Sequence, residues 1–285
     1  MLKVALTHDV DRIHKSFQYF THSLKNLYRG NLNLFFYHLK SIFEENTYWC
    51  FPEIIKIEEE FNAKSTYFFL DESIKFDLFN IKNWKLSIGN YKIDDVKVIE
   101  IIKWLDNNGW EIGLHGSYNS YKDLSLLKNE KQNLESILGH EITGIRQHYL
   151  NLNSNTWELQ SKAGFKYDSS FGFGRSIGYK DSKYNFFFPL EFDQKFMVIP
   201  QVIMDKPFMK IKNRWDEFNS ILDLTERKNL LLVINWHNNH FVDKEFTEFR
   251  KAYMEILKRC RQRNAKFYTL KEYYKENLVT NSKFV

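Results

Sequence analysis

The chain has 285 residues, of which 43% are hydrophobic and 27% are charged, enough to bury one large core and within the size range of a single α/β barrel domain. Its formal net charge is +5, but no basic block stands out, so nucleic-acid binding is not expected. Cys50 and Cys260 lie far apart and outside any metal-binding motif, which argues against a disulfide framework or a cysteine zinc site. The longest apolar run, LLLVI, is far too short to span a membrane, and no apolar leader precedes the first polar cluster. We therefore expect a cytoplasmic protein without a transmembrane segment.

Strand and helix patterns alternate along the chain. Apolar and other residues alternate over residues 2–6, which predicts a first strand, and two helices are expected within residues 12–50, followed by a helix beginning at Pro52. Further strands are expected at 65–70, 110–114, 142–146, 165–168, 197–204, 230–236 and 265–270. Further helices are expected at 94–109, 125–139, 156–164, 214–228 and 245–263, with a closing helix after the last strand. This order favours parallel strand pairing in one α/β barrel.

Polar side chains follow strand after strand in this pattern. They are Asp9, Asp11, His115, Arg146, His148, Asp168 and His237. In a parallel barrel the carboxyl ends of the strands form one face, so these side chains should converge there. Each has an ordinary alternative role, such as a helix cap or a core hydrogen bond, but together they favour a site. Carboxylates with imidazoles suit Zn²⁺, Ni²⁺, Co²⁺ or Fe²⁺, whereas no glycine-rich phosphate loop or nucleophile elbow is present.

Six segments occur in the order LTHDVD, AKSTYFFL, NGWEIGLHG, ITGIRQHY, GFKYDSS and LLLVINWH. They resemble the motifs of the polysaccharide deacetylases, carbohydrate esterase family 4, also called the NodB-homology family. The resemblance implies a single distorted parallel (β/α) barrel of about seven strands. It would form one domain over residues 1–285, with a helical insertion at about 12–60. It also implies a metal-dependent hydrolase that removes an N-acetyl group from a sugar or polysaccharide precursor.

The resemblance implies a role for five residues in catalysis. Asp9 would be the general base that activates water, and Arg146 would keep its carboxylate ionised and oriented. The backbone N–H of Tyr149 would help to stabilise the oxyanion. His237 would be the general acid that protonates the departing amine, with Asp168 setting its tautomer and charge.

The metal ligands depart from the pattern of the family. Its second motif usually carries two histidines four residues apart, but here His115 is followed by Asn119, and His148 stands where the third motif usually has proline. We therefore expect Asp11, His115 and His148 to bind a divalent ion, with Zn²⁺ first and Ni²⁺, Co²⁺ or Fe²⁺ as alternatives. Asn119 could instead ligate through its weak carbonyl oxygen, or the metal could be absent.

The substrate is expected to be an N-acetylated carbohydrate. Asn119, Asn239 and His240 are the candidates for contacts with sugar hydroxyls, with ordinary loop polarity as the alternative. Two other functions stay open: a catalytically inactive carbohydrate- or partner-binding protein, and a hydrolase of a non-sugar amide. The aromatic and basic segment 12–50 is expected to cover the barrel, with a groove lining or peripheral membrane contact as alternatives.

Overall fold

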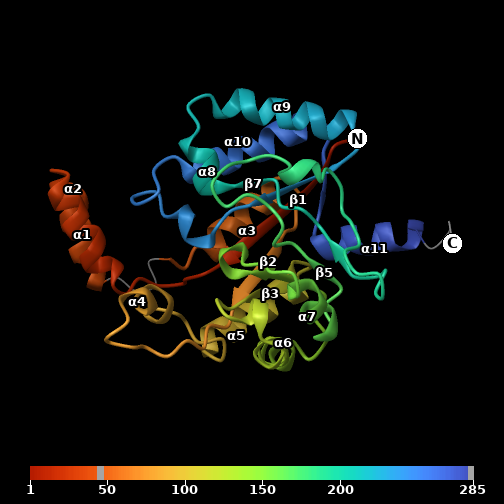
Figure 1. Cartoon of the computed structure of the whole chain (residues 1–285). Coiled ribbons are helices and arrows are strands. Elements are labelled where there is room, and N and C mark those ends of the chain that lie inside the picture. Colours follow the sequence, from red (N-terminus) through yellow and green to blue (C-terminus); the bar gives the residue numbers. More distant parts are fainter. Residues whose placement is uncertain (44–47, 282–285) are drawn as a thin grey trace.

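The fold is built on one parallel sheet (Figure 1), and the computed structural model describes residues 1–43 and 48–281. Eight strands follow one another across the sheet in the order β6-β5-β4-β3-β2-β1-β8-β7, and β9 pairs with β1 beside them. The strands are β1 (Lys3–Val10), β2 (Thr66–Leu70), β3 (Glu111–Gly116), β4 (Gly144–Gln147), β5 (Tyr167–Asp168), β6 (Met197–Val198), β7 (Ile203–Met204), β8 (Leu231–Asn235) and β9 (Lys266–Tyr268). The predicted distorted (β/α) barrel is confirmed.

Strand β1 is central because it pairs with three neighbours. One edge pairs with β8 from Lys3 to Thr7, while the other edge pairs first with β9 and then, from Thr7 onward, with β2. From Val4 to Val10 every residue of β1 is buried, as expected for a strand with both faces covered. The strand extends to Val10, so Asp9 lies within it rather than after it.

The helices predicted between the strands are present. They are α3 (Phe51–Glu60), α5 (Val96–Asn107), α6 (Leu124–Leu138), α7 (Thr156–Lys162), α9 (Arg214–Arg227), α10 (Phe249–Gln262) and α11 (Leu270–Asn281). Asp95 and Asp123 cap the amino ends of α5 and α6 by accepting backbone N–H bonds, and Gly139 ends α6 in the left-handed conformation. In Figure 1, α9 and α10 lie above the sheet and α5, α6 and α7 lie below it.

The segment 197–204, expected as one strand, forms two strands at opposite edges of the sheet. Strand β6 pairs with β5, whereas β7 pairs with β8. Pro200 lies between them and has no N–H to donate to a strand ladder. Within the described residues no pairing joins β6 to β7, so the chain itself crosses the opening of the barrel. The short helices α4 (Ile81–Ser87) and α8 (Asp205–Lys210) were not predicted.

Residues 12–43 form a helical hairpin beside the barrel. Its helices are α1 (Gln18–Tyr28) and α2 (Leu32–Lys40), followed by the 3-10 turn η1 (Ser41–Phe43), and Figure 1 shows them projecting at the left edge. Asn31 caps α2 by accepting a bond from the N–H of Leu34. The two helices expected in this segment are therefore present. The part of the chain that the structure describes contains no helix long and apolar enough to cross a membrane.

Candidate active site

The candidate base lies on β1, facing the inside of the barrel. One carboxylate oxygen of Asp9 accepts a bond from the Arg146 guanidinium at 2.9 Å, and the other accepts a bond from the Asn235 amide at 2.6 Å. Burial would raise the pKa of Asp9, but Arg146 and neighbouring histidines outweigh it and hold the pKa below its usual value. The carboxylate is therefore ionised at neutral pH.

Arg146 is fully buried at the end of β4 and is held from several sides. It donates to Thr7 Oγ1 at 2.7 Å and to the backbone and side-chain oxygens of Ser169 at 3.0 Å. Its guanidinium also lies 4.6 Å from the centre of the Phe68 ring. These contacts orient the guanidinium toward Asp9.

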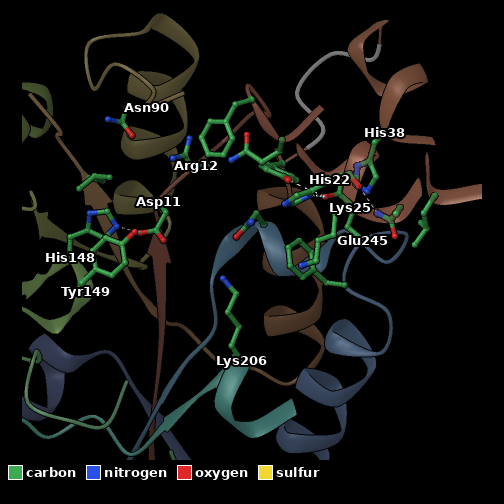
Figure 2. Close-up of a pocket in the computed structure, with 18 of the residues that line it drawn as sticks. Asp11, Arg12, His22, Lys25, His38, Asn90, His148, Tyr149, Lys206 and Glu245 are labelled. Atoms are coloured by element: carbon green, nitrogen blue, oxygen red, sulfur yellow. Dashed lines mark hydrogen bonds and ion pairs between the residues drawn. The ribbon is translucent and has the colours of Figure 1, made fainter. Parts of the chain in front are cut away.

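The three expected metal ligands lie together. One ligand atom from each of Asp11, His115 and His148 is within 4.8 Å of the others. Nε2 of His115 is 3.2 Å from Asp11 Oδ1, and Nε2 of His148 is 3.7 Å from the same oxygen. They come from the ends of β1, β3 and β4 (Figure 2 shows Asp11 and His148 facing each other).

The chemistry of these three side chains fits a divalent cation. The Nδ1–H of His115 donates to the backbone oxygen of Arg146 at 2.9 Å, so in the neutral ring Nε2 presents a lone pair to Asp11. A buried oxygen of Asp11, Oδ1, has no hydrogen-bond partner among the described residues. Burial lowers the pKa of His148 to about 4, so this imidazole is neutral and able to ligate. Facing acceptors repel each other unless a cation lies between them, and one carboxylate with two imidazoles suits Zn²⁺.

The candidate acid, His237, follows β8 and is paired with Asp205. Its Nδ1–H donates to Asp205 Oδ2 at 2.9 Å, and its Nε2 is 3.7 Å from Asp11 Oδ2. Burial alone would lower the pKa of His237, but Asp205 and the site carboxylates raise it to about 9. His237 is therefore protonated at neutral pH.

The carboxylate that pairs with His237 is that of Asp205, and not that of Asp168, which the family resemblance implied. Asp168 accepts bonds from the side chains of Trp157 and Gln160 and from the backbone of Ser170, so it ties β5 to α7. Asp205 was missed because it lies far from the other motifs in the sequence. Yet it directly follows β7, and the rule that found the other polar residues at strand ends would have found it.

The expected sugar-binding residues have different positions. His240 is fully buried and its Nδ1 lies 2.5 Å from Asp205 Oδ2, so the expectation of a direct sugar contact is wrong. Asn239 lines a cavity that is also lined by Asp11. Asn119 begins the 3-10 turn after β3 and is not among the described residues that line either cavity at Asp11.

Two cavities share lining residues of the metal-ligand group, Asp11 and His148. One, of about 280 Å³, is lined by Asp9, Asp11, His115, His148 and His237, among others. The second, of about 690 Å³, runs from Asp11 and His148 to α1, and Figure 2 shows Lys206 reaching toward it. Both are lined by Tyr149, whose backbone is left-handed with φ 58° and whose side chain is exposed.

Comparisons with known proteins agree with this fold. No protein-family model matches the sequence, and no curated protein matches it either. Among solved structures, the fold is that of polysaccharide deacetylases. A putative polysaccharide deacetylase from Mycobacterium smegmatis is similar with a TM-score of 0.60 at 15% identity, over 98% of this chain and 91% of that chain. A probable polysaccharide deacetylase from Pseudomonas aeruginosa is similar with a TM-score of 0.54 at 11% identity, over 96% of this chain and 90% of that chain.

Proposed function

We propose that the protein is a metal-dependent hydrolase that removes an N-acetyl group from a sugar or polysaccharide precursor. The observation that carries the proposal is the arrangement around Asp11. An ionised carboxylate, Asp9, and a protonated imidazole, His237, border the same small cavity as the group formed by Asp11, His115 and His148. Amide hydrolysis needs a base for water, an acid for the amine and an electrophile for the carbonyl, and this cavity offers the first two.

Asp9 takes the proton of the attacking water in this proposal. Arg146 and Asn235 each hold one of its oxygens, so the carboxylate is fixed in position before substrate arrives. Because Arg146 also stabilises the ionised form, the base is ready at neutral pH.

His237 gives a proton to the departing amine. Asp205 holds its Nδ1–H, which leaves Nε2 directed at the cavity as the donating atom. The backbone N–H of Tyr149, at the sharp turn after His148, donates to the oxyanion of the tetrahedral intermediate. A divalent ion held by Asp11, His115 and His148 would supply the Lewis acid that polarises the amide carbonyl.

The test begins with the metal content of the purified protein, measured by elemental analysis. The metal-replete protein is then incubated with N-acetylated monosaccharides and oligosaccharides, and released acetate is measured with and without a chelator. We expect stoichiometric metal and acetate release that the chelator abolishes. Bound metal without acetate release from any of these sugars, or acetate release unaffected by metal removal, would contradict the proposal.

A further inference from the structure

The α1–α2 hairpin exposes apolar side chains along its outer surface. On α1, Phe20, Leu24, Leu27 and Tyr28 are exposed, at the spacing i, i+4, i+7 and i+8 that places them on one helix face. Tyr28 is 93% exposed. The outer face continues with Leu32, Phe36, Ile42 and Phe43 on α2 and η1. A water-facing helix surface of a soluble protein normally carries polar residues.

The inner surface of the same hairpin is polar. Ser23 on α1 and His38 on α2 are buried, and Lys15 is buried and pairs with Glu245, which precedes α10. Lys15 also donates to Ser41 at 3.0 Å. The fully buried side chains of α1 and α2 are thus polar, while most of the large apolar side chains on α1 are exposed, the reverse of a normal surface helix.

This apolar surface is concentrated in one part of the molecule. Of the 17 large hydrophobic residues that are exposed within the described residues, eight lie on the hairpin and four more lie at 76–84, around α4. Figure 1 shows α4 on the same side of the molecule as α1. Scattered exposed hydrophobic residues need no explanation, but a continuous patch marks a contact surface.

The charge of the hairpin decides what kind of surface it contacts. Residues 12–43 contain five Lys or Arg residues and no Asp or Glu, in a chain with 36 acidic residues. Lys25, Arg29 and Lys40 are exposed. A second copy of this chain would bring the same positive charge against it, whereas an anionic surface would be attracted. Exposed Phe, Leu and Tyr beside exposed Lys and Arg are typical of helices that lie in a membrane interface.

We propose that the α1–α2 hairpin docks on the surface of a bilayer that contains anionic lipids, with Phe20, Leu24 and Phe36 entering the boundary between head groups and acyl chains. The helices lie in the interface and do not cross it, in agreement with the lengths of the described helices. The larger cavity at Asp11 is also lined by His22 and Lys25 of α1, so docking would bring the candidate active site close to the lipid head groups. The docking itself does not depend on the proposed function.

The proposal is tested by co-sedimentation of the full chain with vesicles. Phosphatidylcholine vesicles are compared with vesicles that also contain phosphatidylglycerol, at low and at high salt. We expect binding to the anionic vesicles that weakens as salt rises, with much weaker binding to neutral vesicles. No binding to the anionic vesicles at low salt would overturn the proposal.

Variants show whether the hairpin makes the contact. The double variant Phe20→Ser/Leu24→Ser should weaken vesicle binding by about tenfold or more, because two large side chains no longer leave water. Lys25→Ala and Arg29→Ala should each weaken it by about fivefold. Phe192→Ser is the matched control, since Phe192 is 64% exposed and Phe20 is 60% exposed, but Phe192 lies outside the hairpin. All these side chains are exposed, so circular dichroism should show the variants folded.

Two results would overturn the assignment to this hairpin. One is equal vesicle binding by the double variant and by Phe192→Ser. The other is a chain that sediments as a dimer, with the double variant monomeric and vesicle binding unchanged, because the apolar face would then be covered by a second copy.

Discussion

Successive side chains of β1 point to opposite faces of the sheet, so polar residues that are neighbours in the sequence have different surroundings. Asp9 and Thr7 face Arg146, whereas His8 points to the opposite side of the sheet, where its Nε2 lies 2.9 Å from Glu58. Glu58 also accepts bonds from Trp110 and Tyr253. The stretch LTHDVDR therefore supplies a candidate base to one face and a buried structural histidine to the other.

Replacing the candidate base should abolish hydrolysis without removing the metal. Asp9→Asn has nearly the same shape, but its amide accepts no proton from water, so we expect a fall in kcat of about 10²- to 10⁴-fold. Metal content and thermal unfolding should be measured alongside acetate release. Asp95→Asn is a suitable control, because asparagine also caps helices. Near-normal turnover by Asp9→Asn would show that Asp9 is structural.

The two candidate replacements for the missing histidine can be separated by their metal content. His148→Ala should lose most of the bound metal, because its imidazole is directed at Asp11, whereas Asn119→Ala should retain it. Elemental analysis after dialysis is the measurement. Metal retained by His148→Ala and lost by Asn119→Ala would reverse the assignment.

A double substitution tests whether residues 119 and 148 can exchange the role of metal ligand. If the two positions exchange the role of ligand, Asn119→His with His148→Pro should restore metal binding relative to His148→Ala. Gln147, which would precede the new proline, has φ −76° and ψ 136°, a conformation that the residue before a proline readily adopts. Failure of the double variant to bind metal, with its fold intact, would show that the positions are not equivalent.

At the scale of elements, the division of 197–204 into β6 and β7 determines the partner of His237. Strand β7 pairs with β8, and Asp205 follows β7 directly, so its carboxylate meets the backbone N–H and the ring of His237. Asp168 is the last residue of β5, which is separated from β8 by β4, β3, β2 and β1 along the sheet. The strand order, rather than any local motif, selects the carboxylate.

The pH profile should reveal which carboxylate controls the acid. A donor is active while it is protonated, so the alkaline limb of kcat/KM follows the pKa of His237, which its carboxylate neighbours raise. Asp205→Asn removes the carboxylate that raises the pKa of His237 most. The alkaline limb of kcat/KM should therefore move to lower pH, toward the ordinary histidine pKa of about 6.5. Asp168→Asn should leave the limb in place. A shift with Asp168→Asn and none with Asp205→Asn would contradict the pairing.

Asp168 should instead matter for stability. Its carboxylate accepts bonds from Ser170, Gln160 and Trp157, and Asp168→Ala would leave these donors without their acceptor. We expect the free energy of unfolding to fall by about 3 kcal/mol. Urea unfolding measures this change. A loss below about 1 kcal/mol would show that these contacts are weak or are replaced by water.

At the scale of the whole molecule, the Glu245 carboxylate is one of the contacts between the hairpin and the rest of the chain. Glu245 pairs with Lys15 and accepts a bond from Tyr48 at 3.0 Å. Burial would raise the pKa of Glu245, but His22 and Lys15 outweigh it and hold the pKa below its usual value. The segment around Glu245 thus fixes the position of α1 relative to the cavity at Asp11.

Removing this carboxylate should loosen the hairpin. Glu245→Ala leaves the buried ammonium of Lys15 without its opposite charge, which costs about 3 kcal/mol or more locally. We expect trypsin to cut at Lys25 or Arg29 sooner than in the wild type, with the cleavage sites identified by mass spectrometry. Glu248→Ala, which removes only an exposed ion pair with Lys251, is the control and should leave the cleavage rate unchanged. Equal rates for both variants would mean that Glu245 does not hold the hairpin.

Most of the strands and helices, and most of the polar residues that meet at the site, could be predicted from the sequence alone. Strand alternation, helix caps and the end of each strand are local features, so Asp11, His115 and His148 could be expected to lie together from their positions alone. The tertiary fold was needed to show that Asp205 rather than Asp168 pairs with His237, and that His240 is buried behind it. Those contacts depend on the order of strands across the sheet and on the chain crossing the barrel opening at Pro200, which are set by packing between segments far apart in the sequence. The tertiary structure also shows that the apolar face of the hairpin points outward. The periodicity of α1 and α2 predicts an apolar stripe but does not show on which side of the helices the barrel lies.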